Sequence, residues 1–249
     1  MYNSSWFHFP LFAMFKIPKY PNLTELAYLH IKRYILDGTF SEGTKLTEDT
    51  LAARLGISKS PVREALNRLE SEGLVSIEPR RGAYVRRFTL QEACDLYGLR
   101  EVLEVHAVGL ARITPSFLKD LADSIERIKA DLDERNAIAY VEEDIRFHNL
   151  IAAATGNKEL CRILENISQK TALCRSKTYR LVAADSPDCH DRICQALKEG
   201  NRELAQQAMR EHILFFRDAL LRSLEDEEEL NADSSEEANL AAAGASGVD

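Results

Sequence analysis

The segment TEDTLAARLGISKSPVREALNRL, residues 47–69, predicts two short helices joined by a tight turn. Thr47 is a suitable N-cap for the first helix, and the acids that follow it suit a helix N-terminus. Gly56 ends this helix, because glycine readily takes the left-handed backbone of a helix end. The second helix begins near Ser58 and tolerates Pro61 in its first turn. This arrangement is typical of a helix-turn-helix, whose second helix enters the major groove of DNA.

The leading end of the second helix carries side chains that suit contact with nucleic acid. Ser58 and Ser60 can donate hydrogen bonds to phosphate. Lys59 and Arg63 can reach phosphate or the O6 and N7 atoms of guanine. The same residues also fit an ordinary solvated helix face, so the flanking sequence has to decide between the two interpretations.

The flanking sequence adds a further helix and a hairpin. Apolar spacing predicts a helix over residues 23–37. The β-rich runs 74–77 and 83–87 surround the turn EPRRG, which predicts a β-hairpin. Such a hairpin is a wing whose cations can reach phosphates or a minor groove. The residues at its tip are Arg80, Arg81 and Gly82. A basic wing beside a basic helix end favours DNA over the solvated face.

The net charge of −8 over 249 residues is unevenly distributed. Residues 1–87 carry 13 Lys and Arg against 9 Asp and Glu, a net charge of +4. Residues 88–224 carry 19 against 22, a net charge of −3. Residues 225–249 hold nine acids and no base, and they lack aromatic residues. We predict a disordered solvating tail there, with a mimic of nucleic acid as the alternative. The acidity therefore does not exclude DNA as a partner of the N-terminal part.

Residues 88–224 are predicted to form an all-α antiparallel bundle, so the whole chain is mainly α. Apolar positions recur there at helical spacing, and short connections favour antiparallel neighbours. No apolar run approaches the roughly 18 uncharged residues of a membrane span. The expected helices cover residues 90–112, 116–135, 137–155, 158–182, 187–199 and 201–224.

Histidines are the chemical feature of this bundle. Asp144 and His148 lie four residues apart and therefore share one helix face. His190 and His212 lie beside apolar residues on two further helices. One Asp and three His from three helices can converge on a divalent metal. Spacing alone leaves the alternative of hydrogen-bonded core histidines open.

The N-terminal segment from Ile35 to Val85 resembles the winged-helix domain of GntR-family bacterial transcription regulators. The matching motifs include L-A-x-x-L-G, S-x-x-P-V-R-E-A-L, E-G-L-V and R-G-x-x-V. The resemblance implies DNA contacts from Ser58, Lys59, Ser60, Arg63 and the wing tip at Arg81-Gly82. Lys59 stands where Arg is usual, which puts bidentate base recognition in doubt. Asp49 stands where some members place a DNA-contacting Arg, so that contact is not carried over.

The stretches LREVLEVHAVGLA, DIRFHNLIAAATGNKEL and CHDRICQALKEGNRELAQQAMREHI resemble the helical FCD domain of the FadR-type branch. That resemblance implies a divalent transition metal, Zn²⁺ or Ni²⁺, as cofactor. It also implies a small carboxylate effector. The residues in the metal-binding positions are Asp144, His148, His190 and His212. Arg100 matches a family arginine near the pocket, with a salt bridge to Glu104 as the alternative, and Arg175 is a weaker effector candidate of the same kind.

Together these features predict a metal- and effector-responsive DNA-binding regulator, expected to be a repressor and not an enzyme. A two-fold homodimer would read a palindromic operator. Two alternatives stay open: a metal-dependent hydrolase built on the Asp/His cluster, and a regulator with a purely structural metal. Five cysteines without a regular framework and no signal peptide of usual form suggest the bacterial cytoplasm, at the nucleoid when DNA-bound. The expected divisions are an N-terminal extension at 1–19, a winged-helix domain at 20–87, an effector domain at 88–224 and the tail at 225–249.

Overall fold

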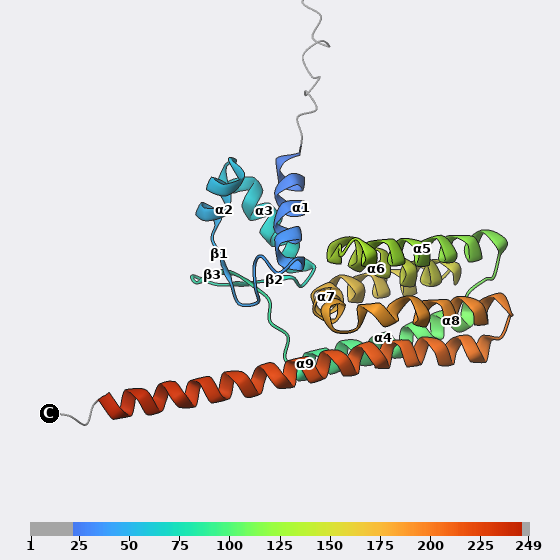
Figure 1. The fold of residues 1–249 in the computed structure, drawn as a ribbon. Helices are drawn as coiled ribbons and strands as arrows, with labels where there is room; N and C mark the ends of the chain where they lie inside the picture. Colours follow the sequence, from blue (N-terminus) through green and yellow to red (C-terminus); the bar gives the residue numbers. More distant parts are fainter. Residues whose placement is uncertain (1–21, 246–249) are drawn as a thin grey trace, which may run out of the picture.

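The computed structural model describes the backbone of residues 22–245 and the side chains of 22–179, 181 and 183–227. The predicted extension at 1–19 lies outside these residues. The first part of the described chain folds into a small helical domain with one sheet (Figure 1). Its elements are α1 (Leu23–Leu36), β1 (Lys45–Leu46), α2 (Glu48–Leu55), α3 (Lys59–Ser71), β2 (Val75–Glu78) and β3 (Gly82–Val85).

The helix-turn-helix is built as its sequence predicts. The Thr47 side chain accepts a hydrogen bond from the backbone N–H of Thr50 and so caps α2. Gly56 ends α2 with φ 66°, in the left-handed region where a Cβ is costly. Helix α3 follows, and its apolar stripe is buried against α1 and α2. The stripe consists of Val62, Ala65, Leu66 and Leu69.

The wing belongs to a three-stranded antiparallel sheet with the order β1-β3-β2. The hairpin of β2 and β3 matches the expectation, whereas β1 was not foreseen. Strand β1 is only two residues long, with Lys45 opposite Tyr84 and Leu46 opposite Ala83. A pairing that short leaves no periodic pattern in the sequence.

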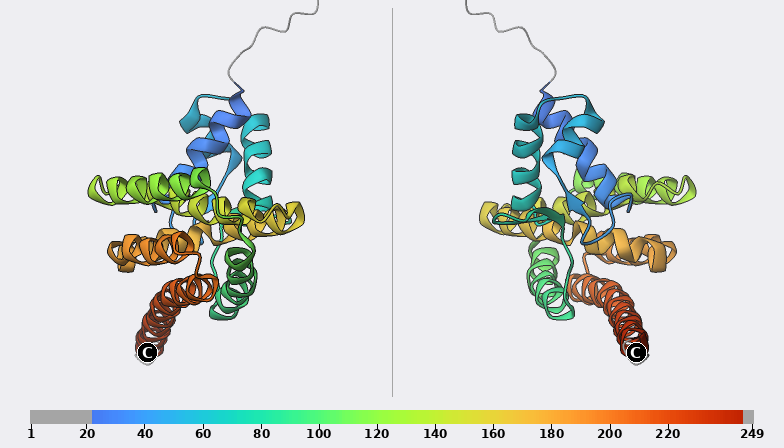
Figure 2. Two further views of the ribbon diagram at one scale, coloured as in Figure 1. Left: turned by 90° about the vertical axis from the view of Figure 1, so that its right-hand side faces the viewer. Right: turned by 90° about the vertical axis from the view of Figure 1, so that its left-hand side faces the viewer.

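The second part of the chain is a helical bundle, as expected. Thr89 and Glu92 form a reciprocal capping box that begins α4. Helices α4 and α9 lie side by side along one edge of the bundle (Figure 2). The elements are α4 (Leu90–Leu110), α5 (Pro115–Asp133), α6 (Ala137–Ala154), α7 (Lys158–Val182), a 3₁₀ turn (Ala183–Asp185), α8 (Ser186–Lys198) and α9 (Arg202–Ala245).

Helix α9 differs from the expectation at its C-terminal end. The prediction placed a disordered tail at 225–249, but the described backbone stays helical to Ala245. The physical reason is composition: residues 225–243 contain neither Pro nor Gly, and their Glu, Ala and Leu residues are good helix formers. An established helix extends through such a segment at low cost, since nucleation is already complete.

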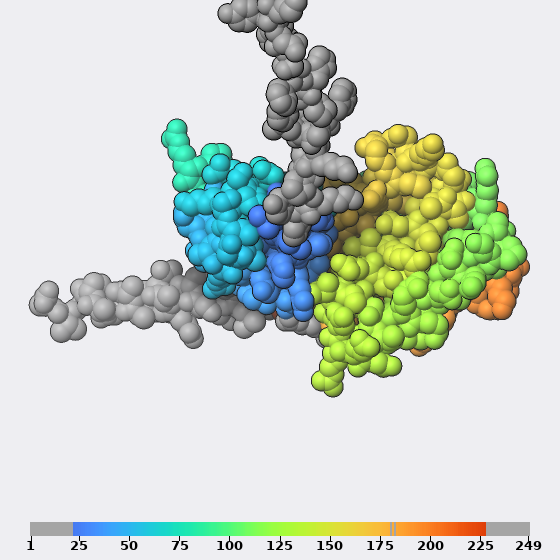
Figure 3. Space-filling view, turned by 90° about the horizontal axis from the view of Figure 1, so that it is seen from above, coloured from blue at the N-terminus to red at the C-terminus, as the bar shows by residue number. Residues whose placement is uncertain are grey.

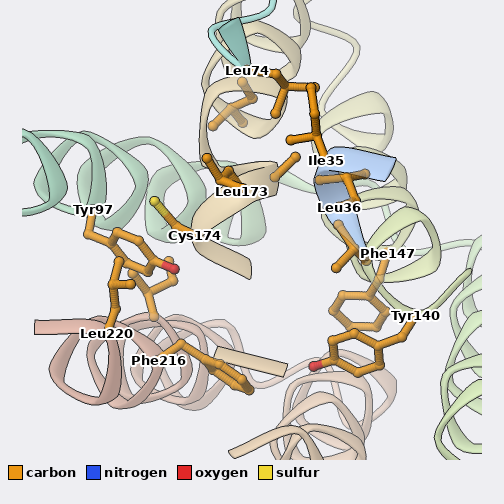
Figure 4. Packing of buried hydrophobic residues seen from close by; sticks show 14 of the residues in the cluster. Ile35, Leu36, Leu74, Tyr97, Tyr140, Phe147, Leu173, Cys174, Phe216 and Leu220 are labelled. Atoms are coloured by element: carbon orange, nitrogen blue, oxygen red, sulfur yellow. The ribbon is translucent and has the colours of Figure 1, made fainter. Parts of the chain in front are cut away.

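The two domains pack against each other through α1 and α7. They form adjoining lobes in the space-filling view (Figure 3). Ile35 and Leu36 of α1 lie beside Leu173 of α7, within one continuous buried cluster (Figure 4). The Ser176 hydroxyl donates to the backbone oxygen of Leu36 at 2.5 Å. No helix among the described residues is long and apolar enough to cross a membrane.

Candidate functional site

The bundle brings the four predicted metal ligands together. Asp144 and His148 lie one turn apart on α6, His190 lies on α8 and His212 on α9. All four residues are buried, and none is more than 6% exposed. One donor atom from each lies within 4.8 Å of the donor atoms of the other three. The four residues therefore form one cluster that could hold a metal ion.

The donor atoms of this cluster have spacings that suit a metal ion. His148 Nε2 and His212 Nε2 are 3.1 Å apart. His190 Nε2 lies 3.2 Å from Asp144 Oδ1, and His148 Nε2 lies 3.9 Å from the same oxygen. Ligand bonds of about 2.1 Å in tetrahedral geometry separate donors by about 3.4 Å. Imidazole nitrogens with one carboxylate are also a donor set suited to Zn²⁺ or Ni²⁺, so the residues fit the metal that the resemblance implies.

Two further polar groups contact the Nδ1 atoms of the candidate histidine ligands. Glu104 Oε2 on α4 lies 2.5 Å from His148 Nδ1. The Ser186 hydroxyl lies 3.2 Å from His190 Nδ1. Contacts of this kind fix the ring orientation and tautomer of histidine ligands. Sequence reasoning treated Glu104 only as a partner of Arg100 and did not identify Ser186, since both contacts arise from packing between helices.

The surroundings of the cluster favour the neutral form of His190 and His212. Burial holds the pKa of His190 and of His212 well below 6.5, and neighbouring His148 lowers both further. Burial alone would raise the pKa of Glu104, but Arg100 and His148 outweigh it and hold that pKa well below its usual range. Neutral imidazole is the form that binds metals, so the two histidines carry no proton that a metal must displace near neutral pH.

The two effector candidates occupy different places beside the cluster. Arg175 is buried on α7, and its Nη1 atom contacts Asp144 Oδ2. Its Nε and Nη2 atoms are buried without a hydrogen-bond partner among the described residues, and so is the Tyr97 hydroxyl. Arg100 is buried in a 2.7 Å pair with Glu104, the alternative weighed from the sequence. Arg100 thus supports the carboxylate that contacts His148, and Arg175 holds the unused donors.

Arg175 has two buried donor atoms without a hydrogen-bond partner among the described residues. Burial lowers the pKa of Arg175 to about 9, with Arg100 adding to the effect. A buried polar group without a partner costs about 1–3 kcal/mol. An anion beside Arg175 would satisfy both free nitrogens, and Tyr97 could add a third donor. Nothing in the sequence pattern around Tyr97 pointed to this role.

The predicted DNA-contacting side chains lie at the exposed N-terminal end of α3 and hold ion pairs with α2. Lys59 Nζ lies 2.5 Å from Asp49 Oδ1. Arg63 donates two hydrogen bonds to Glu48, each of 2.7 Å. The Arg63 side chain stays 63% exposed, so these pairs can exchange for phosphate or base contacts.

The remaining candidates lie beside these pairs and at the wing. Ser58 precedes α3 and its side chain makes no capping hydrogen bond, whereas the Ser60 hydroxyl donates to Glu64 at 3.4 Å. Arg81 pairs with Glu78 at 2.6 Å. Arg80 has φ 66° and Gly82 has φ 109°, so the wing tip holds a non-glycine residue in a left-handed conformation.

Comparisons with known proteins agree with this architecture. Residues 23–85 match the model of bacterial regulatory proteins of the gntR family, and residues 95–215 match the FCD domain. The chain is 31% identical over 197 residues to an uncharacterized HTH-type transcriptional regulator, YdhC, of Bacillus subtilis. The aligned region covers 74% of this chain and 85% of that protein. The chain is also 29% identical over 191 residues to the gluconate operon transcriptional repressor of Bacillus subtilis. This alignment covers 73% of this chain and 78% of the repressor.

Solved structures show the same fold. A GntR transcriptional regulator from Rhodococcus sp. RHA1 matches with a TM-score of 0.68 and 25% identity over 80% of this chain and 97% of that one. E. coli McbR/YncC matches with a TM-score of 0.67 and 23% identity over 81% of this chain and 98% of that one. These matches confirm the mainly α fold with a winged helix-turn-helix, and the relatives are regulators, not enzymes. The chain belongs to the GntR family of bacterial DNA-binding transcriptional regulators and carries an FCD domain behind its winged helix.

Proposed function

We propose that this regulator is a FadR-type repressor that binds a palindromic operator as a homodimer and is switched by a small carboxylate beside a divalent metal. It would act in the bacterial cytoplasm, at the nucleoid when bound to DNA. The observation that carries the proposal is the convergence of four buried ligands with one buried arginine that has unused donors. The ligands are Asp144, His148, His190 and His212, and the arginine is Arg175.

The charges around the cluster support an anionic effector. Asp144 and Glu104 carry negative charges, and Arg100 and Arg175 balance them. With neutral histidines, a divalent cation would leave about two uncompensated positive charges in a buried site. Buried charge of that kind is costly unless a counter-charge accompanies it.

A carboxylate effector suits the remaining donors. When bound, the metal would supply Lewis-acid positions for a carboxylate oxygen. Arg175 could bind a second carboxylate oxygen through its planar guanidinium, and the Tyr97 hydroxyl could add a neutral donor. We retain Arg100 as an effector candidate, although it is already paired with Glu104, the carboxylate that contacts His148.

Two roles of the metal can be separated by experiment. In a thermal-shift screen of small organic acids, an acid that binds the site should raise the melting temperature of the Zn²⁺-loaded protein. The same acid should leave the melting temperature of the EDTA-treated protein unchanged. A purely structural metal predicts stabilisation by Zn²⁺ alone and no response to any acid. Arg175→Lys serves as the matched variant, since it keeps the charge and loses the planar fork.

The winged-helix domain would bind the operator through the end of α3 and the wing. Base readout is proposed for Lys59 and Arg63, and phosphate or minor-groove contact for the wing. Ser58 and Ser60 would donate to phosphate. The wing contributors are Arg80, Arg81 and Gly82. A polarisation assay on the DNA upstream of its own gene tests this proposal, and absence of sequence-specific binding at moderate salt, with and without Zn²⁺, contradicts it.

Helix α7 offers a route from the effector site to the DNA-binding domain. It carries Arg175 at the cluster and Ser176 against Leu36 of α1. An effector that binds one arrangement of α7 better than another would shift the placement of the winged helix. The resulting change in the free energy of operator binding would be limited by that difference in the free energy of effector binding.

A further inference from the structure

Lys177, on α7, joins three segments that are far apart in the sequence. Its Nζ atom lies 3.2 Å from Glu42 Oε2, in the loop between α1 and β1 of the DNA-binding domain. The same atom donates to both carboxylate oxygens of Glu227 on α9, at 3.1 and 2.9 Å. One ammonium group therefore holds a carboxylate of the DNA-binding domain and a carboxylate of the last helix of the bundle.

The pair between the two domains is partly sheltered from solvent. The side chains of Lys177 and Glu42 are 19% and 18% exposed, whereas that of Glu227 is 50% exposed. Ion pairs at the surface contribute little because water and salt screen them, and burial reduces this screening. The pair of Lys177 with Glu42 is thus placed to influence how the DNA-binding domain is held on the bundle.

Glu42 is the less completely paired of the two carboxylates. Its Oε1 atom is buried without a hydrogen-bond partner among the described residues. Burial raises the pKa of Glu42, because the contact with Lys177 offsets only part of the cost of burying the charge. Glu42 would therefore gain from a larger share of the Lys177 ammonium, which Glu227 holds through two contacts.

The loop that carries Glu42 is bonded directly to the wing. The backbone N–H of Gly43 donates to the Val85 oxygen at 2.9 Å, and the Val85 N–H donates to the Thr44 oxygen at the same distance. Val85 is the last residue of β3, a strand of the wing. The Arg87 side chain also covers Gly43, since a Cβ there would lie 2.5 Å from Arg87 Nη2. A change in the position of Glu42 is thus passed to the wing through backbone hydrogen bonds.

The two bundle helices that meet at Lys177 also contribute to the proposed metal site. Helix α7 carries both Arg175 and Lys177, and α9 carries both His212 and Glu227. The three charged residues Glu42, Lys177 and Glu227 line a cavity of about 650 Å³ between the domains. This cavity gives their side chains room to change partners.

We propose that Glu42 and Glu227 compete for Lys177, which makes Lys177 a positioning residue for the wing. When Glu227 holds the ammonium, the loop before β1 is held less firmly. When the end of α9 moves away, the ammonium pairs with Glu42 alone and holds the wing more firmly. This contact differs from that of Ser176 with Leu36, which reaches α1 and not the wing. The proposal requires neither the metal nor the effector.

Amide hydrogen exchange of the full chain in EDTA tests the competition. Glu227→Gln should slow exchange at residues 43–44 and in β3 about threefold, because Lys177 then pairs with Glu42 alone. Glu42→Gln should speed exchange at the same amides about threefold, because the loop loses its pair. Two carboxylates that only stabilised the fold would both speed exchange when removed, so the opposite signs identify competition.

A second background and a control make the test specific to Lys177. In Lys177→Met protein, Glu227→Gln should have no effect on wing exchange, because there is no ammonium to redistribute. Glu159→Gln is the matched control, since it breaks a 2.8 Å pair with Arg162 within α7 and should leave the wing unchanged. If Glu227→Gln fails to slow wing exchange, or slows it equally in the Lys177→Met background, the proposal is wrong.

Polarisation titrations against the DNA upstream of its own gene extend the test to function. Glu42→Gln and Glu227→Gln should shift the affinity for this DNA in opposite directions, each by about two- to threefold. Shifts in the same direction would contradict a role of the competition in placing the wing. If the wild type does not bind this DNA, the proposed operator is wrong, and the exchange measurements still decide whether the carboxylates compete for Lys177.

Discussion

Arg175 and Ser176, consecutive residues of α7, contact opposite parts of the molecule. Arg175 Nη1 contacts Asp144 at the proposed metal site, and the Ser176 hydroxyl donates to the Leu36 backbone oxygen at 2.5 Å. Successive residues of an α-helix point about 100° apart, so one helix can contact both places. The proposed effector site and the DNA-binding domain therefore contact neighbouring residues of the same helix.

Ser176→Ala should loosen the docking of α1 without disturbing the metal cluster. The lost hydrogen bond should cost about 1 kcal/mol. Amide hydrogen exchange near the C-terminal end of α1 should become faster, while Zn²⁺ affinity stays unchanged. Ser71→Ala is the control, because the Ser71 hydroxyl also donates to a backbone oxygen, that of Arg68, but within α3. Equal exchange in both variants would contradict a docking role for Ser176.

Removing one ligand should abolish the response of the protein to chelators. The wild type should lose thermal stability when EDTA removes the metal, since a ligand that binds only the folded state stabilises it. His190→Ala should bind Zn²⁺ at least about 100-fold more weakly and respond little to EDTA. His30→Ala, at an exposed position on α1, is the control. A His190→Ala protein that keeps the wild-type response to EDTA would rule out His190 as a ligand.

The metal-free protein should lose stability on acidification. Burial holds the pKa of His190 and of His212 well below 6.5, so the unfolded chain takes up protons first as the pH falls. The stabilising effect of the neutral histidines is complete above 6.5 and declines below it, by up to about 1.4 kcal/mol per histidine per pH unit. Urea unfolding in EDTA at several pH values measures this. The double variant His190→Gln, His212→Gln should have a flatter profile, and an equally steep one would contradict the assignment.

The sequence predicted the features that depend on neighbours along the chain. The cap at Thr47 and the helix end at Gly56 are local, and the turn between Asp144 and His148 follows from helical spacing alone. The contact of Glu104 with His148 joins α4 to α6, and the unused donors of Arg175 depend on which groups packing buries beside them. Such relationships follow from tertiary packing, which leaves no periodic signal in the sequence.

The pair of Lys59 with Asp49 should restrain DNA binding. Asp49 Oδ1 lies 2.5 Å from Lys59 Nζ and places a negative charge beside the proposed DNA-contacting end of α3. Asp49→Asn should raise operator affinity about three- to tenfold at low salt and less at high salt. Arg63→Ala should lower operator affinity about ten- to hundredfold, chiefly for the specific site. Polarisation titrations against operator and scrambled DNA measure both effects. An Asp49→Asn protein with unchanged affinity would show that the pair does not compete with DNA.

A substitution at the strained wing turn should change protein stability and DNA affinity in opposite directions. Arg80 has φ 66°, a conformation that costs a side-chain-bearing residue roughly 1 kcal/mol. Arg80→Gly should therefore stabilise the free protein by about that amount. It should also weaken operator binding and reduce the dependence of log affinity on log salt by about 1, because one cation is lost. Arg80→Lys keeps both the charge and the strain, so it should match the wild type in both measurements. If Arg80→Gly binds the operator with the wild-type salt dependence, Arg80 does not contact the phosphates.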